Sequence, residues 1–156
     1  MTDRPDNAGV VVHPPIAWGL VIAAGFALRW LAPLPLLPTG LPAGCIGVIA
    51  FVLPLALGLW AVATMVGAGS NVPTNRPTTI IVESGPYRLT RNPIYLGMFI
   101  GLVGLAIGFD DFWFAIALVP FALIIRYGVV AREEAYLDRK FGDLYRSYCA
   151  HVRRWL

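Results

Sequence analysis

The sequence is poor in charged residues. Only 13% of its 156 residues are charged, which is about half the share that is usual in a soluble domain. Hydrophobic residues make up 58% of the chain, and the mean hydropathy is +0.69. A soluble domain of this length needs more polar residues than this to cover its surface. The composition therefore indicates a protein whose surface is largely in contact with lipid.

Cysteine and histidine are scarce as well. The two cysteines, Cys45 and Cys149, lie far apart in the sequence, and so do the two histidines, His13 and His151. Neither pair has the spacing of a disulfide framework or of a metal-ligand motif. We therefore expect no disulfide framework and no metal site.

The features of a signal peptide are also missing. The residues ahead of the first apolar run include Asp3, Arg4 and Asp6, and they lack a basic start and a small-residue cleavage site. We expect the first apolar run to be a retained helix.

Four apolar stretches are candidate transmembrane helices: 15–32, 44–66, 93–109 and 112–131. The second has 23 residues without a charge, enough to cross a hydrocarbon core of about 30 Å at about 1.5 Å per residue. We expect Pro54 to kink it. Only Asp110 and Asp111 separate the last two stretches, so these two helices must form an antiparallel hairpin.

Two polar segments remain, the connection 67–92 and the tail 132–156. Apolar residues of the tail share one helical stripe, which predicts an amphipathic helix with a break at Gly142; they are Leu137, Phe141, Leu144, Tyr145 and Tyr148. The whole pattern predicts an all-α polytopic integral membrane protein. It has about four transmembrane helices and a C-terminal amphipathic helix, in a single domain over residues 1–156.

The third apolar stretch carries a regular series of glycines, Gly97, Gly101, Gly104 and Gly108. Their spacing keeps them on one helical face, where the backbone of a neighbouring helix can approach closely. The stretch begins with Asn92-Pro93, which is typical of an N-cap residue followed by proline at the first helical position.

Positive charge gathers in the connection and the tail, whereas the turn at Asp110 and Asp111 is acidic. The positive-inside rule then predicts that the connection, the tail and both termini lie in the cytoplasm. Because the basic tail is interleaved with acidic residues and follows an apolar span, we expect it to face membrane lipids and not nucleic acid. Arginine far outnumbers the single lysine, Lys140, a bias that favours a GC-rich bacterial source. We therefore expect the protein to lie in a bacterial inner membrane.

Chemically versatile residues are dense between Ser84 and Gly97. These 14 residues hold two arginines, two tyrosines and a predicted helix N-terminus. A helix N-terminus favours an anionic ligand group, and Tyr87 and Tyr95 can lie against a cation or a planar ring. The alternative is an ordinary turn with a helix cap and interfacial tyrosines.

A second dense region begins at Arg132-Glu133-Glu134. Arg126 precedes Glu133 by seven residues, so the two side chains leave a helix from nearly one face. An arginine inside an apolar span is a functional candidate by default. The alternative is that Arg126 extends to the lipid headgroups while the glutamates cap the exit from the membrane.

These two regions together resemble the signature of the isoprenylcysteine carboxyl methyltransferase family. The motifs are Gly85-Pro86-Tyr87-Arg88, then Arg91-Asn92-Pro93-x-Tyr95-Leu96-Gly97, then Glu133-Glu134-x-x-Leu137-x-x-x-Phe141-Gly142-x-x-Tyr145-x-x-Tyr148. Phospholipid methyltransferases share this pattern more loosely. The resemblance covers roughly residues 67–156 and keeps the family's order and separation of the blocks.

The resemblance implies S-adenosylmethionine as methyl donor and a lipophilic acceptor that is reached from the bilayer. The residues that it implies at the donor site are Thr79, Ile80, Ile81, Val82, Tyr87, Asn92, Pro93, Ile94, Tyr95 and Glu133. Asn92 stands where many relatives have histidine. The family's substrate-side arginine has no unambiguous match, because Val129 is nearest and Arg126 and Arg132 flank it. Arg126, Arg132 and Tyr95 are therefore the candidate catalytic residues.

Several functions stay open at this point. A carboxylate acceptor is already nucleophilic, so methyl transfer to it needs no strong base, and alignment by the protein suffices. A phospholipid amine or a small thiol is the alternative acceptor, and a non-catalytic accessory protein is the alternative to an enzyme. A soluble Rossmann-type methyltransferase is excluded, because no strand leads into a glycine-rich loop.

Overall fold

The computed structural model describes residues 6–38 and 40–156, and over these residues it contains helices and no strand. The helices are α1 (Pro14–Leu31), α2 (Ala43–Gly67), the 3₁₀ turn η1 (Gly85–Arg88), α3 (Pro93–Gly108), α4 (Phe112–Leu123), the π-helix η2 (Ile124–Val130), α5 (Ala131–Phe141) and α6 (Asp143–His151). The prediction of an all-α protein is therefore confirmed. Asp3 and Arg4 lie outside the described residues.

The apolar helices are long enough for a polytopic membrane protein. Within the described residues, three helical stretches have the length and composition to cross a membrane: Pro14–Leu31, Ala43–Gly67 and the continuous run Phe112–Phe141. Helix α3 is apolar but has only 16 residues. This agrees with the expected count of about four. The expected break in the tail is also present, because Gly142 separates α5 from α6 with a φ of 54°.

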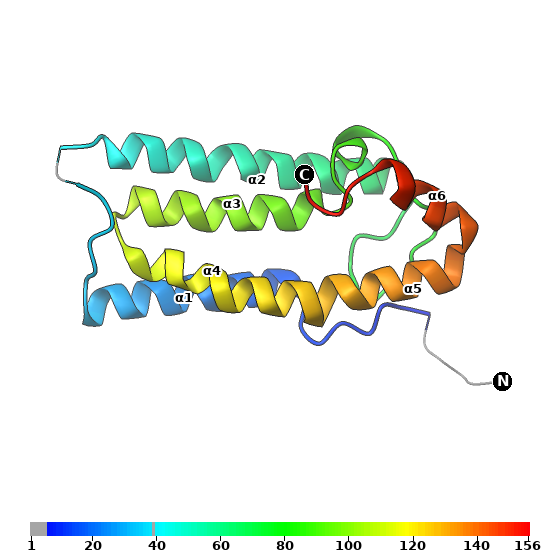
Figure 1. Cartoon of the computed structure of the whole chain (residues 1–156), viewed down its shortest axis with the longest axis horizontal. Helices are drawn as coiled ribbons and strands as arrows, with labels where there is room; N and C mark the ends of the chain where they lie inside the picture. Colours follow the sequence, from blue (N-terminus) through cyan, green and yellow to red (C-terminus); the bar gives the residue numbers. More distant parts are fainter. Residues whose placement is uncertain (1–5, 39) are drawn as a thin grey trace.

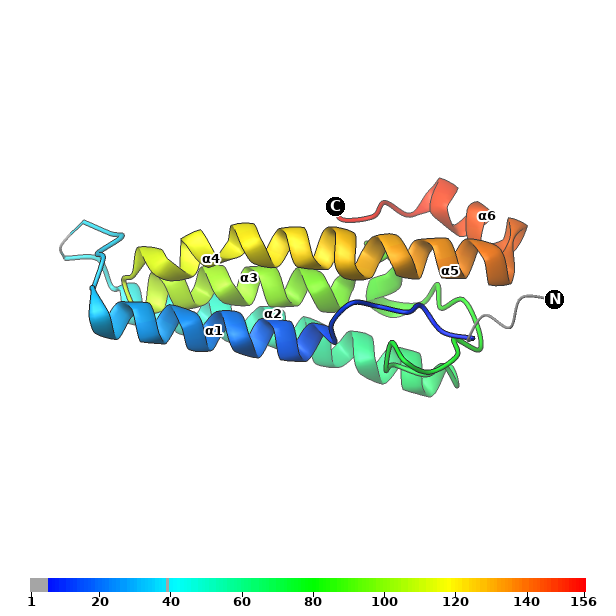
Figure 2. The ribbon, with the colours of Figure 1, turned by 90° about the horizontal axis from the view of Figure 1, so that it is seen from below.

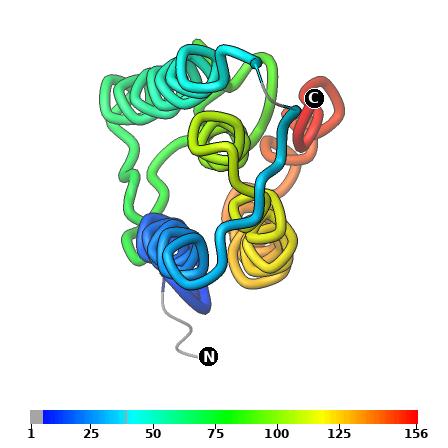
Figure 3. The backbone as a smooth tube through the Cα atoms, turned by 90° about the vertical axis from the view of Figure 1, so that its left-hand side faces the viewer, coloured from blue at the N-terminus to red at the C-terminus, as the bar shows by residue number. Residues whose placement is uncertain are grey.

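The long helices lie side by side as a bundle (Figure 1). Seen end-on, α3 lies between α2 and α4, and α1 completes the bundle beside α4 (Figure 3). Helices α4, η2 and α5 continue into one another, so that α5 extends beyond the bundle at the end that also holds α6 and residues 67–92 (Figure 2). The loop after α1 and the turn between α3 and α4 lie at the opposite end.

Glycine allows α2 and α3 to pack with their backbones in contact. A Cβ atom added at Gly47 of α2 would lie 2.1 Å from the Cα of Gly108, and one added at Gly104 would lie 2.6 Å from the backbone of Ala50. At Gly97 an added Cβ would lie 2.6 Å from the carbonyl oxygen of Pro54. The expectation of a close helix contact is thus confirmed for Gly97, Gly104 and Gly108, and the partner is α2, whereas Gly101 lies nearest the Trp18 ring of α1.

Asp110 and Asp111 organise the opposite end of the bundle. The buried carboxylate of Asp111 accepts a hydrogen bond from the Trp113 amide (2.9 Å), which caps α4, and forms an ion pair with Arg29 (3.2 Å). Asp110 accepts hydrogen bonds from the amides of Leu36 (3.0 Å) and Leu37 (2.7 Å). The acidic turn therefore anchors the proline-rich loop that follows α1.

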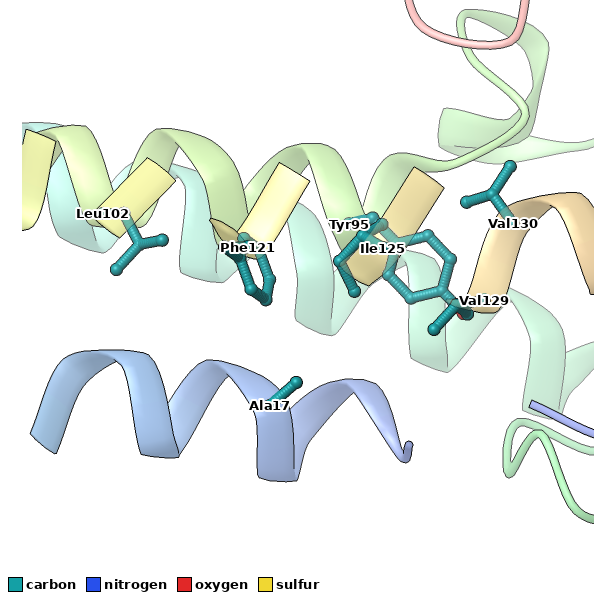
Figure 4. Close-up of a cluster of buried hydrophobic side chains, with 7 residues drawn as sticks. All are labelled: Ala17, Tyr95, Leu102, Phe121, Ile125, Val129 and Val130. Atoms are coloured by element: carbon teal, nitrogen blue, oxygen red, sulfur yellow. The ribbon is translucent and has the colours of Figure 1, made fainter. Parts of the chain in front are cut away.

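The core between α1, α3 and the α4–η2 helix is apolar (Figure 4). Its buried side chains are Ala17, Tyr95, Leu102, Phe121, Ile125, Val129 and Val130. The π-helix η2 carries three of them, and it begins soon after Pro120, which cannot donate a backbone hydrogen bond. A π-helix changes the register of the helix that follows. Its widened turns thus help to set the face on which α5 presents Glu133.

Gly44 and Gly47 offer a matched test of the α2–α3 contact, because they lie three residues apart on α2. Gly47→Ala should lower the free energy of unfolding by about 1–3 kcal/mol, since its Cβ would press on the backbone of Gly108. Gly44→Ala should leave stability unchanged or slightly raised, because its Cβ meets nothing within 4 Å and alanine favours a helix. Thermal unfolding in detergent measures both, and equal shifts would contradict the close contact.

Candidate functional site

A cavity of about 140 Å³ lies at the end of the bundle where residues 67–92, the start of α3, α5 and α6 meet. This main cavity is lined by four tyrosines besides Tyr95, and by the carboxylate of Glu133. Its other walls are mostly apolar. The main cavity thus combines aromatic rings with one carboxylate, Glu133, and one arginine, Arg91, at the boundary of the apolar helices.

Nine of the ten residues expected at the donor site line this cavity: Ile80, Ile81, Val82, Tyr87, Asn92, Pro93, Ile94, Tyr95 and Glu133. They come from three separate parts of the chain, which only the fold brings together. Thr79 is the exception and does not line the cavity; its hydroxyl donates a hydrogen bond to the carbonyl of Gly69 (2.7 Å). The binding role of these residues stays a prediction.

A side-chain hydrogen bond in the main cavity joins α3 to α5. The Tyr95 hydroxyl donates a hydrogen bond to Oε1 of Glu133 (2.8 Å). Within residues 6–38 and 40–156, no ion pair includes Glu133, although its neighbour Glu134 pairs with both Arg154 (2.7 Å) and Arg91 (3.4 Å). A half-buried carboxylate without a cation is costly, so the cavity favours a positively charged ligand.

Tyr148 and Tyr87 connect α6 to η1 in the wall of the main cavity. The Tyr148 hydroxyl of α6 donates a hydrogen bond to the carbonyl of Tyr87 (2.8 Å), and both side chains are buried. Burial raises the pKa of both phenols above its ordinary value, because a phenolate would lose its hydration. Both hydroxyls therefore stay protonated at neutral pH, and that of Tyr148 acts as a hydrogen-bond donor.

Tyr136 lines the main cavity, although it was not among the residues expected at the donor site. Its hydroxyl accepts a hydrogen bond from the Thr78 amide (3.1 Å) and donates one to Asp6 (2.8 Å), which also pairs with Lys140 (2.7 Å). These hydrogen bonds hold both the N-terminal segment and the connection 67–92 beside the main cavity. Ala8 of the N-terminal segment is one of the residues that line the cavity. The sequence signal that could have indicated Tyr136 is the group of tyrosines in the tail, because Tyr145 and Tyr148 of that group line the same cavity.

The last residues of the chain return to the start of α3. The carbonyl of Arg154 accepts hydrogen bonds from the side-chain amide of Asn92 (2.9 Å) and the hydroxyl of Thr90 (3.1 Å), and the carbonyl of Arg153 accepts one from the Arg91 amide (3.0 Å). Asn92 occupies the N-cap position of α3, but its side chain makes no capping hydrogen bond. The prediction that the Asn92 side chain caps α3 is therefore wrong. The side-chain amide of Asn92 instead donates its hydrogen bond to the carbonyl of Arg154 near the chain terminus.

Arg126 and Arg132 lie outside the main cavity. The exposed Arg132 donates a hydrogen bond to the carbonyl of Gly9 (3.0 Å), and the guanidinium of Arg126 lies 5.4 Å from the centre of the Tyr127 ring. Neither is among the residues that line the main cavity. Of the three candidate catalytic residues, the fold thus brings only Tyr95 into the cavity. The roles of both arginines stay predictions.

Residues 43–144 match the model of the phospholipid methyltransferase family. An uncharacterized protein of Haemophilus influenzae is 38% identical over 63 residues, which are 40% of this chain and 100% of that protein. The nickel-cobalt-cadmium resistance protein NccN of Alcaligenes xylosoxydans xylosoxydans is 34% identical over 71 residues, which are 45% of this chain and 33% of NccN. The likeness to NccN thus covers only a part of each chain.

Neighbouring arginines allow the attachment of the chain terminus to be tested. Arg154→Ala removes two hydrogen bonds to Glu134 and should lower the free energy of unfolding by about 1 kcal/mol, since the pair is partly solvent-exposed. Arg153→Ala should leave stability unchanged, because the exposed side chain makes no hydrogen bond or ion pair within the described residues. Thermal unfolding in detergent compares the two variants. A larger effect of Arg153→Ala would refute this account of the terminus.

Proposed function

The chain belongs to the phospholipid methyltransferase family, and on that basis we propose that this membrane methyltransferase takes its methyl group from S-adenosylmethionine and transfers it to a lipophilic acceptor. The observation that carries the proposal is Glu133, a carboxylate in the main cavity that bonds Tyr95 and makes no ion pair within the described residues. A ligand with positive charge would compensate it.

The chemistry of the main cavity fits S-adenosylmethionine. This molecule carries a sulfonium, an ammonium group, a carboxylate and a planar adenine ring. Glu133 would neutralise a positive group, the buried Tyr87 offers an aromatic surface, and the N-terminus of α3 at Pro93 would favour the carboxylate. When bound, S-adenosylmethionine supplies an electrophilic methyl carbon that bonds to an acceptor lone pair while its sulfur keeps the electrons of the broken bond.

The residues of this chain would mainly bind the methyl donor and orient it toward the acceptor. The Tyr95 hydroxyl fixes the orientation of Glu133, and the hydrogen bond from Tyr148 holds the Tyr87 backbone against α6. Aligning two reactants contributes strongly to a displacement of this kind, because it removes much of the entropic cost of their meeting. In our proposal Thr79 to Val82 contribute backbone to the donor site, and Arg126 and Arg132 are the candidate contacts of the acceptor's polar group.

We favour a carboxylate acceptor, as in the isoprenylcysteine carboxyl O-methyltransferase type, because an ionised carboxylate needs no base to become nucleophilic. A phospholipid amine is the second candidate, and the family whose model matches supports it. A small thiol or amine would have to lose a proton, and the tyrosines of the cavity are poor bases because burial keeps Tyr87 and Tyr148 protonated.

The proposed orientation places the main cavity on the cytoplasmic side of a bacterial inner membrane. The basic connection and the basic tail lie at the cavity end of the bundle, whereas Asp110 and Asp111 lie at the other end. The positive-inside rule assigns the basic end to the cytoplasm, where S-adenosylmethionine is made. Residues 1–5 at the N-terminus lie outside the described residues, so their side of the membrane stays a prediction.

Calorimetric binding of S-adenosylmethionine to the detergent-purified protein tests the donor site. Glu133→Ala should weaken binding by tenfold or more, about 1.4 kcal/mol, because the positive charge of the ligand loses its counter-charge. Glu83→Ala is the matched control, since Glu83 is exposed and does not line the main cavity. If the folded wild type bound no S-adenosylmethionine, a non-catalytic accessory role would replace the proposal.

Expression in a host that lacks methylated phospholipids separates the two acceptors. A carboxyl methyltransferase should leave the phospholipid headgroups unchanged, whereas a phospholipid N-methyltransferase should produce methylated amine headgroups. Mass spectrometry of the extracted lipids reads the outcome, and Glu133→Ala serves as the inactive control. Methylated amine headgroups in the wild type alone would overturn our preference for a carboxylate.

A further inference from the structure

A second cavity of about 120 Å³ lies between α1, α2 and α3. This apolar cavity is lined only by apolar side chains and glycines, and Ile94 lines both it and the main cavity. The one polar atom among its side chains, the indole N–H of Trp18, already donates a hydrogen bond to the Met98 carbonyl (3.0 Å). The apolar cavity therefore offers nothing to a polar ligand but is suited to a hydrocarbon.

We propose that the apolar cavity holds one alkyl chain of the methyl acceptor, and that Trp18 and Phe51 close its deep end and thereby limit the chain length. The inference rests on the proposed function, because Ile94 is the shared wall between a donor in the main cavity and a chain in the apolar cavity. A chain seated there would place its polar head beside the main cavity.

The length of the apolar cavity agrees with an alkyl chain in one leaflet. Along α2 its lining runs from Val62 to Phe51, which corresponds to about 16 Å at about 1.5 Å per residue. The hydrocarbon core of a bilayer is about 30 Å thick, so one leaflet contributes about half of it. A lipid chain could thus keep its normal direction while it occupies the cavity.

Small residues leave the room for this chain, and the outer rim faces the bilayer. A Cβ atom added at Gly58 would meet nothing within 4 Å, which marks open space beside α2. On the same helix Leu55 is 43% exposed and Leu59 is 63% exposed, although both line the apolar cavity. Side chains that are both exposed and cavity-lining form a lateral opening through which a chain can enter from the lipid.

Packing and a hydrogen bond hold the two aromatic rings at the deep end of the apolar cavity in place. The rings of Trp18 and Phe51 are stacked, with centroids 6.0 Å apart and an interplanar angle of 8°. The hydrogen bond from Trp18 to the Met98 carbonyl fixes the indole, and Gly101 packs against it, since an added Cβ would lie 3.3 Å from the ring. A chain that is too long would have to displace this pair.

Photo-crosslinking with a fatty acid that carries a terminal diazirine tests the occupant without relying on turnover. In detergent, mass spectrometry should find the label on the Trp18–Phe51 end of the apolar cavity, in competition with unlabelled fatty acid. Gly58→Leu should reduce this labelling by about tenfold, because the new side chain fills the cavity. Gly44→Leu, on the same helix and equally free of close neighbours, should leave the labelling unchanged.

Chain-length preference tests the role of the aromatic pair. Phe51→Ala should move the preferred length in a series of unlabelled competitor fatty acids toward longer chains, whereas Val52→Ala, at an exposed neighbouring position, should not. Calorimetry with S-adenosylmethionine on each variant reports donor binding separately. Intact donor binding with labels spread evenly over the exposed helix faces would overturn this inference alone, whereas absent donor binding in the wild type would overturn the proposed function.

Discussion

The close contact between α2 and α3 is the constraint on which the other parts of this structure depend. Gly47, Gly104 and Gly108 remove the side chains that would otherwise separate the two backbones. In a bilayer, where apolar side chains gain little by leaving lipid, this packing of backbone on backbone supplies much of the attraction. Because α3 is held against α2, Ile94 and Tyr95 are carried to the place where residues 67–92 close over the bundle. The main cavity forms there.

The two neighbouring glutamates of α5 have different interaction partners. Consecutive residues point about 100° apart on an α-helix, so Glu133 and Glu134 face different partners. Glu134 receives Arg154 from the returning chain terminus and Arg91 from the start of α3, whereas Glu133 faces the main cavity and contacts the hydroxyl of Tyr95. Because Arg154 and Arg91 pair with Glu134, Glu133 has no ion pair within the described residues, and a cationic ligand could supply its counter-charge.

Much of the architecture could be predicted, because helices in a membrane protein have strong local signals. Apolar runs, prolines and the Asp110-Asp111 turn place helix ends within a few residues, as α2 shows. Nine of the ten residues expected at the donor site also line the main cavity. Contacts made by the chain terminus could not be predicted, because nothing local to Asn92 indicates that its amide bonds the carbonyl of Arg154. Tyr136 was missed for the same reason, since its partners Thr78 and Asp6 lie far away in sequence.

The sequence by itself determined that the protein is helical, apolar and suited to a membrane, and it predicted a donor site that includes Tyr87, Tyr95 and Glu133. These properties depend on composition, on helical periodicity and on residues a few positions apart. Only the tertiary structure decided which glutamate has no ion pair within the described residues. It also decided that Arg126 and Arg132 lie away from the main cavity, and that the apolar cavity adjoins the main cavity at Ile94. Each of these depends on distances between helices, which no local pattern encodes.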